Sequence, residues 1–204
     1  YAGGVLRGND LAEIIKRSTG IAGLDLVLNG GVPSGTRIII SGSPLSGLEL
    51  LAQQFWQAGE EGGTYLMLDA VPEEGMTDAR GMDAAALAGA MQGERIVVDS
   101  LSTLITAWGI DAATRFVLED TRGIIDRGAN IVYLLYTNHH TPLEEARMMR
   151  AADVFIVLRH EIHGNEVERT LAVEKLKGGE VPQRVIPYHI IAKGLELSTT
   201  SRVV

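Results

Sequence analysis

The stretch Arg37–Leu51, RIIISGSPLSGLELL, changes character twice. Its first part is a run of isoleucines of the kind that forms a buried strand. A segment rich in glycine and serine follows, and from Leu48 onward the residues LELLAQQFWQAG have helical periodicity. The stretch therefore predicts a strand, a tight turn and a helix in direct succession.

The same alternation of short β-branched runs and helical patterns continues along the chain. Strands are predicted at Arg37–Ser41, Thr64–Leu68, Arg95–Asp99, Asn130–Tyr136 and Val154–Leu158. Helices are predicted at Leu48–Ala58, Asp83–Met91, Asp111–Arg127 and Leu143–Met149. This rhythm indicates an α/β fold with a mostly parallel central sheet that is flanked by helices.

After Leu158 the pattern changes to alternating segments separated by glycine and proline, EVERTLAVEKLKGG and QRVIPYHIIAKGLEL. These segments predict antiparallel strands that extend one edge of the sheet. We interpret residues 1–204 as one domain, with an N-terminal extension (1–17), a core (18–158) and a C-terminal antiparallel extension (159–204).

The composition excludes several classes of function. The 204 residues carry a net charge of −8, which disfavours general attraction to nucleic acid or to an anionic membrane. There is no cysteine, so disulfides, thiolate nucleophiles and cysteine-bound metals are excluded. No apolar stretch reaches about 18 residues and the N-terminus has no secretory pattern. We expect a cytoplasmic protein without a membrane segment.

The turn has the glycine spacing of a phosphate-binding loop, G-x-x-x-x-G-K-[ST], with Gly42 and Gly47 in the two glycine positions. Leu48 and Glu49 stand where that pattern has lysine and a hydroxyl residue. Lysine would reach the β and γ phosphates and the hydroxyl would ligate magnesium. The candidate nucleotide-binding residues of this altered loop are Gly42, Ser43, Ser46, Gly47, Leu48 and Glu49. A carboxylate at position 49 would repel phosphates.

Three ordered blocks resemble the KaiC-like branch of the RecA superfamily of P-loop ATPases. They are STGIAGLDLVLNGGVPSGTRIIISGSP, RIVVDSLSTLI, and RTLAVEKLKGG with VIPYHIIAKGLEL. The resemblance runs from about Ser18 to Leu197. It implies a RecA-like P-loop core, and single-domain archaeal proteins are the expected relatives. It also implies association with copies of itself or a protein partner, since members of the family form rings or filaments.

The resemblance also implies roles for individual residues. Asp99, which ends RIVVD, stands in the Walker B position that supports magnesium when nucleotide binds. Asp69-Ala70 aligns with two catalytic glutamates, so Asp69 is a candidate base shortened by one methylene, and Ala70 has no carboxylate. Glu73 and Glu74 are interpreted as residues that cap or solvate the next segment.

Other positions correspond to residues that act at the γ-phosphate in the family. Asn138 follows the strand IVYLLYT, where a polar residue can sense that phosphate. Lys175 and Lys177 match fingers that reach a neighbouring subunit's nucleotide. Each position has a structural alternative: Asp99 could accept hydrogen bonds at a strand end, and the two lysines alternate with Val173 and Leu176 as on a solvated sheet edge.

Two further groups of residues do not predict a site. His139 and His140 are adjacent and point apart on an extended chain, so they do not predict a metal site. Arg147 and Arg150 lie where recombinases contact DNA, but Glu144 and Glu145 are beside them in the sequence.

Three functions follow from these readings. The leading one is a non-hydrolysing regulatory or interaction module with no cofactor. The second is an ATPase that uses ATP and Mg²⁺, its missing charge supplied by Arg37, Lys175 or Lys177 of the same or a neighbouring subunit. The third is a DNA-associated accessory factor related to recombinase paralogues, which would need a partner because the chain itself is acidic.

Overall fold

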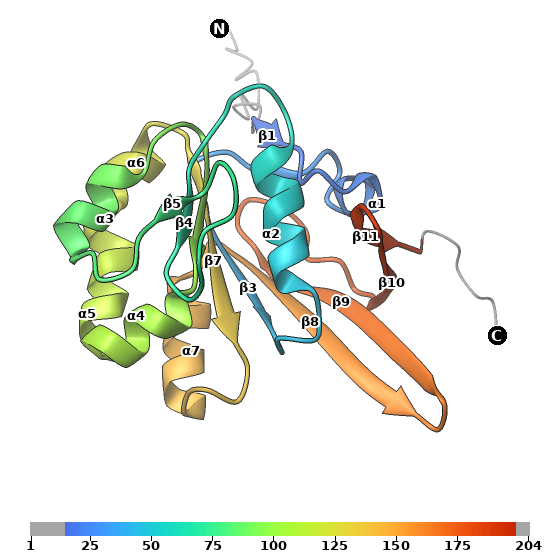
Figure 1. The fold of residues 1–204 in the computed structure, drawn as a ribbon. Helices are drawn as coiled ribbons and strands as arrows, with labels where there is room; N and C mark the ends of the chain where they lie inside the picture. The colour runs from blue at the N-terminus through green and yellow to red at the C-terminus, as the bar shows by residue number, and fades with distance from the viewer. Residues whose placement is uncertain (1–14, 199–204) are drawn as a thin grey trace, which may run out of the picture.

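A computed structural model of the protein describes residues 15–198. Its main feature is a nine-stranded sheet in the order β11-β10-β9-β8-β3-β7-β6-β4-β5 (Figure 1). Its strands are β3 (Arg37–Gly42), β4 (Tyr65–Met67), β5 (Thr77–Asp78), β6 (Arg95–Asp99), β7 (Asn130–Tyr136), β8 (Val154–His163), β9 (Glu166–Leu176), β10 (Ile186–Ile191) and β11 (Gly194–Leu197). A separate pair is formed by β1 (Lys16–Arg17) and β2 (Val32–Pro33).

The central strands from β8 to β5 are parallel, and β9, β10 and β11 are added antiparallel at one side. β3 lies between β8 and β7, and β7 separates it from β6. The carboxyl ends of β3, β4, β6 and β7 therefore meet at one end of the sheet, which we call the loop end. Ligands of open α/β sheets bind at this end.

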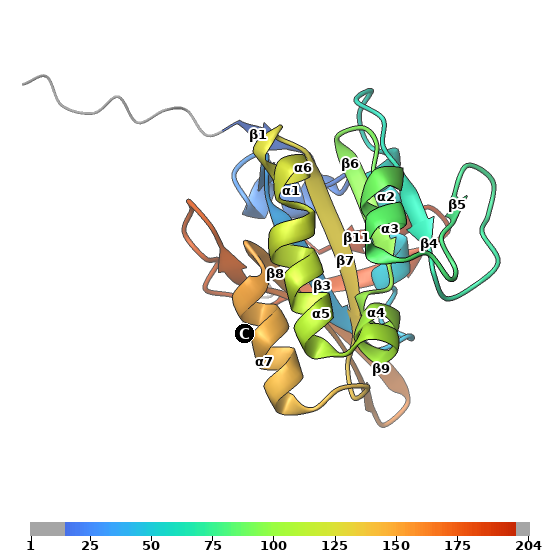
Figure 2. The ribbon, with the colours of Figure 1, turned by 90° about the vertical axis from the view of Figure 1, so that its left-hand side faces the viewer.

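Helices cover both faces of the sheet. The helices are α1 (Ala22–Val27), α2 (Leu48–Gln57), α3 (Ala84–Ala90), α4 (Leu101–Trp108), α5 (Ile110–Arg115), the π-helix η1 (Phe116–Asp120), α6 (Arg122–Asp126) and α7 (Pro142–Ala151). The face seen in Figure 2 carries α7 and the helices from α3 to α6, whereas α2, α1 and the β10–β11 hairpin cover the other face.

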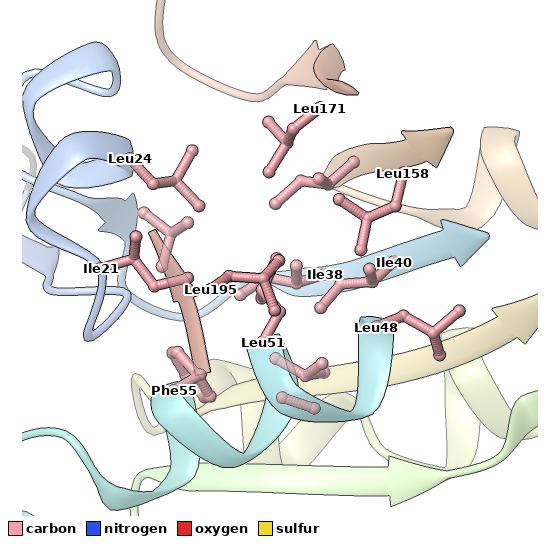
Figure 3. Close-up of a cluster of buried hydrophobic side chains, with 14 of the residues drawn as sticks. Ile21, Leu24, Ile38, Ile40, Leu48, Leu51, Phe55, Leu158, Leu171 and Leu195 are labelled. Carbon is pink, nitrogen blue, oxygen red and sulfur yellow. The ribbon is translucent and has the colours of Figure 1, made fainter. Parts of the chain in front are cut away.

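The isoleucine run of β3 supplies both cores, because side chains alternate across a strand. Ile38 and Ile40 pack with Leu48, Leu51 and other residues of α2, as Figure 3 shows. Ile39 packs into the cluster beneath the helices of the opposite face. Burial of such side chains provides the main stabilisation of the fold, at roughly 1.5–3 kcal/mol per fully buried Leu or Ile.

The predicted fold class is confirmed, and two element predictions need correction. β8 continues to His163 instead of ending at Leu158, because its exposed second half pairs with β9 and does not need apolar residues on both faces. The predicted helix 111–127 is divided into α5, η1 and α6. No helix within residues 15–198 is long and apolar enough to cross a membrane.

Candidate functional site

The turn between β3 and α2 keeps the close backbone packing of a phosphate loop. Gly47 has φ +81°, in the left-handed region that favours glycine. Ser46 is fully buried, and its Oγ donates to the carbonyl oxygen of Ser43 at 2.7 Å. A Cβ added at Gly42 would lie 2.5 Å from the Ser46 Oγ. The two glycines are therefore required by the shape of the turn itself.

The β10–β11 hairpin packs directly on this turn. The Tyr188 hydroxyl donates to the carbonyl oxygen of Ser46 at 2.6 Å. Ile190 and Leu195 lie so close to Gly47 that an added Cβ would be 3.0 Å and 3.3 Å from their Cδ1 atoms. The hairpin thus fixes one side of the turn with a hydrogen bond and apolar contacts.

Leu48 occupies the position at which a phosphate loop has its lysine, and it is 0% exposed. It belongs to the core cluster shared by α2 and β3 (Figure 3). Further along the same helix, the Gln54 side chain bonds both the backbone N–H and the carbonyl oxygen of Leu195, at 2.7 Å and 3.1 Å. Helix α2 is therefore held in place by its own apolar face and by β11.

Glu49 accepts a hydrogen bond from the Tyr136 hydroxyl, with 2.9 Å between that oxygen and Oε1. Tyr136 is the last residue of β7, which lies next to β3. Burial is the largest cause that raises the pKa of Tyr136, and the charges of Asp99 and Glu49 raise it further. Tyr136 is therefore a neutral donor over the whole working range of pH.

Asp99 is almost completely buried, at 3% exposure, and accepts from the Tyr65 hydroxyl at 2.7 Å. Burial raises the pKa of Asp99 to about 6, the Tyr65 bond opposes this shift, and the charges of Asp69 and Glu49 add to it. Within residues 15–198, no lysine or arginine forms an ion pair with Asp99, Asp69 or Glu49. The site is therefore acidic and its charge is not neutralised by a basic side chain.

Asp69, after the end of β4, is exposed but both of its carboxylate oxygens accept hydrogen bonds. The Ser100 Oγ donates to Oδ2 at 2.7 Å and the Thr103 Oγ1 donates to Oδ1. Ser100 also caps helix α4, since its Oγ accepts from the backbone N–H of Thr103 at 3.3 Å. Asp69 is thus tied to the beginning of α4.

We refer to these contacts together as the hydroxyl–carboxylate network. Its members are Tyr136 with Glu49, Tyr65 with Asp99, and Ser100 and Thr103 with Asp69. Its donors are neutral, and the described part of the chain holds no group of three or more His, Asp or Glu side chains placed to hold a metal ion.

Comparison with known proteins identifies the family. The model described as "Family of unknown function (DUF7125)" matches residues 69–200, and a KaiC ATPase model matches residues 17–88. The chain belongs to the DUF7125 family. It is also a KaiC-like domain of the RecA superfamily, as the resemblance predicted.

Individual relatives agree with this assignment. A UPF0273 protein of Methanopyrus kandleri is 43% identical over 58 residues, which are 27% of this chain and 23% of the relative. The circadian clock oscillator protein KaiC of Parathermosynechococcus lividus is 24% identical, with 93% of this chain and 43% of the relative covered. The DUF7125 chain therefore spans less than half the length of these relatives.

A solved structure has the same fold. The KaiC-like protein from the hyperthermophilic archaeon Pyrococcus horikoshii superimposes with a TM-score of 0.74, and 91% of this chain and 99% of that chain are covered. The two sequences are 16% identical, so this likeness bears on the fold alone.

The structure brings Asn138 to the loop end of the DUF7125 domain, in the turn after β7, where it is exposed with φ +64°. The neighbouring Thr137 donates its N–H to the carbonyl oxygen of Gly42 at 3.0 Å. Glu73 and Glu74 are both exposed in the segment after β4. Asn138 thus lies beside the altered loop as the sequence placed it.

Lys175 and Lys177 lie at the opposite end of the sheet, because β9 runs antiparallel to β8 and its last residues face the first residues of β8. The Lys175 Nζ donates to the carbonyl oxygen of Arg150 at 3.0 Å, at the end of α7. The Lys177 Nζ bonds the Asp153 Oδ1 at 3.0 Å. Both lysines are engaged within their own chain.

Arg37 lies at the same far end. It is the first residue of β3 and contacts the Asp153 Oδ2 at 3.3 Å. The six residues of β3 separate it from the loop by about 17 Å. The structure therefore does not place Arg37, Lys175 or Lys177 beside the loop of their own chain.

Several site residues were not found from the sequence. Tyr65, Tyr136 and Tyr188 supply the hydroxyl donors of the loop end. The sequence signal for these three residues is a tyrosine that lies in a strand, or at its end, near a phosphate-loop pattern. Arg169 was also not found from the sequence. Burial raises the pKa of the Tyr188 hydroxyl to about 12, and the positive charge of the Arg169 side chain opposes that rise.

Proposed function

We propose that this DUF7125 domain does not hydrolyse ATP and acts as a regulatory or interaction module. The observation that carries the proposal is the hydroxyl–carboxylate network, in which Glu49, Asp69 and Asp99 each accept from a hydroxyl of the same chain. The burial of Leu48 supports it, because this residue stabilises the core at the position where a lysine would meet phosphate.

The residues present do not fit a magnesium triphosphate. Glu49 puts a negative charge where a magnesium-binding hydroxyl would stand, and it already accepts from Tyr136. Asp99 accepts from Tyr65, and its pKa is raised mainly by burial and further by its acidic neighbours. A triphosphate would bring more negative charge into this poorly screened site. Loss of the cation should cost several kcal/mol of transition-state stabilisation in phosphoryl transfer.

The position of the basic residues argues against a site completed within one chain. Arg37, Lys175 and Lys177 lie at the other end of the sheet and have partners there. Only a neighbouring subunit could bring such residues to the loop. The DNA-associated alternative gains no support either, since Arg147 bonds Asp111 at 2.6 Å and the chain is acidic.

Phosphate release from Mg-ATP tests the proposal. The wild type, Asp99→Ala and the Lys175→Ala/Lys177→Ala double variant are compared at low and high protein concentration. We expect no turnover above the blank in any sample. Turnover at ordinary enzyme rates, roughly 1 s⁻¹ or more, that is lost in Asp99→Ala would refute the proposal. A rate that rises with concentration and disappears in the double lysine variant would establish a site completed between subunits.

A further inference from the structure

The distal parts of β8 and β9 leave the body of the sheet as a two-stranded arm, residues 159–169, which protrudes in Figure 1. β3 pairs with β8 only as far as Leu158. β10 pairs with β9 only at Leu171 and Thr170. Beyond these points the two strands pair with each other down to His163 and Glu166. An isolated two-stranded ribbon is marginally stable in water, so this one gains from a partner.

The two faces of the arm differ in chemistry. Ile162 and Val167 are a cross-strand pair on one face, and they are 67% and 48% exposed. On the other face the His163 Nε2 lies 3.2 Å from Glu161 and 3.5 Å from Glu168. The arm therefore carries an exposed apolar pair next to a row of groups that can form ion pairs.

Both outer edges of the arm are unpaired. The outer edge of β9 pairs with β10 only at Leu171 and Thr170, so its residues from Glu166 to Arg169 have no second neighbouring strand among the described residues. The outer edge of β8 from Arg159 to His163 pairs with no other strand among the described residues. This edge contains neither proline nor lysine, the residues that commonly protect exposed edges from pairing with another chain.

We propose that the β8 edge of the arm pairs antiparallel with the same edge of a second copy of this chain, about a two-fold axis at Ile162. In this register Ile162 faces the partner's Ile162, and Glu161 faces the partner's His163. By symmetry, His163 faces the partner's Glu161. The edge is self-complementary, as a two-fold interface requires, because Ile162 meets its copy and each Glu161 carboxylate meets a His163 ring, which pairs with it as an ion when protonated.

The β9 edge does not offer the same match. Antiparallel pairing of β9 about Val167 would place Glu166 opposite the partner's Glu168, and like charges directly opposite each other are destabilising. The comparison of the two edges selects β8 as the pairing edge and the second copy as its occupant.

The contact is small, because each arm contributes only a few residues, so the dimer is weak and needs a high protein concentration to form. The inference rests on the interaction part of the proposed function. It fails independently of the nucleotide part, since the altered loop contributes no residue to the paired edge.

Sedimentation equilibrium of the full chain over about 1–300 μM, a range that brackets micromolar association, tests the arm. The wild type is expected to form a dimer, and Ile162→Lys to remain monomeric because two lysines would meet at the axis. Glu161→Lys should raise the dissociation constant about tenfold, since attraction becomes repulsion at two symmetric positions. The double variant Glu161→Lys/His163→Glu restores opposite charges across the interface and should recover most of the affinity.

Glu196→Lys is the matched control, because it makes the same charge reversal at an exposed strand position in β11, outside the arm, and should leave the dimer intact. A wild type that stays monomeric over the whole concentration range would overturn the inference. So would a dimer that is unaffected by Ile162→Lys, or a charge-swapped double variant no better than Glu161→Lys. Phosphate release is measured separately, so its result does not affect this one.

Discussion

The carboxylates at the two ends of the sheet have different partners. Where the parallel strands begin, Asp153 is shared by Arg37 and Lys177, at 3.3 Å and 3.0 Å. Where they end, the side chains of Glu49 and Asp99 accept only from tyrosine hydroxyls within residues 15–198. The end that is built to hold a phosphate in a working loop is thus acidic, and the basic residues are at the other end. This separation argues against nucleotide binding within one chain.

The difference extends to the buried groups. Arg95, at the start of β6, is 1% exposed and satisfied by Glu61 and by the carbonyl oxygens of Ser18 and Phe55. Asp99, at the end of the same strand, has one hydroxyl donor and no basic partner among the residues that the structure describes. A buried charge with partners contributes to a fixed structure, whereas a buried charge without a counter-ion costs stability when it is ionised.

The largest expected effect is at Arg95. Replacing it with alanine removes the donor shared by Glu61 and the carbonyl oxygens of Ser18 and Phe55 and leaves a cavity, and it should lower the free energy of unfolding by about 3–5 kcal/mol. Urea unfolding at pH 7.5 measures this change. Arg80→Ala is the control, because its ion pair with Asp78 is exposed and its loss should have no measurable effect. A mild loss at Arg95 would mean that the two ends of the sheet do not differ as described.

The second effect is at Asp99 and depends on pH. Its pKa is raised from 3.8 to about 6. The favourable contribution of the protonated form is complete below pH 3.8 and is lost as pH rises through 6. Asp99→Asn removes this titration, so its stability relative to the wild type should improve between pH 4 and 6.5, by up to about 3 kcal/mol.

Urea unfolding of both proteins at several pH values from about 3.5 to 8, bracketing the titration, checks this difference. Asp111→Asn serves as the control, since that carboxylate is exposed. A stability difference between Asp99→Asn and the wild type that does not change with pH would show that Asp99 has a counter-ion at neutral pH.

The smallest effect is at Tyr136. Tyr136→Phe removes the hydroxyl that bonds Glu49 and should lower the free energy of unfolding by about 1 kcal/mol. Calorimetric titration of this variant with ATP should show no binding, because the Glu49 carboxylate remains. Gained affinity for ATP would instead identify the Tyr136 bond as the barrier.

Much of the fold was predictable because the sheet is built from strongly patterned strands. β6 and β7 have the predicted bounds, Arg95–Asp99 and Asn130–Tyr136, since both strands are buried β-branched runs. Helix α4 was not predicted, because its sequence LSTLITAW continues the apolar character of β6 without a separating turn signal. The arm beyond Leu158 was missed as part of a strand because exposed ribbons tolerate polar residues on both faces.

The candidate site was predictable in position but not in its contacts. The glycine spacing located the loop, and the family resemblance located Asp69 and Asp99. The hydroxyl partners lie far away in the sequence: Tyr65 and Asp99 are 34 residues apart, and Glu49 and Tyr136 are 87 apart. Such pairings are set by the neighbouring positions of β3, β7, β6 and β4 in the sheet, which local periodicity does not encode. The functional roles of these residues stay predictions.

The most direct test of the account is calorimetric titration of the wild-type protein with ATP and with ADP, with and without magnesium. We predict no heat of binding up to millimolar nucleotide, because the loop has leucine in the lysine position and the nearby carboxylates accept from hydroxyls of the same chain. Micromolar or tighter binding, at about −8 kcal/mol or better, would contradict it and show that the site has been rebuilt with other residues.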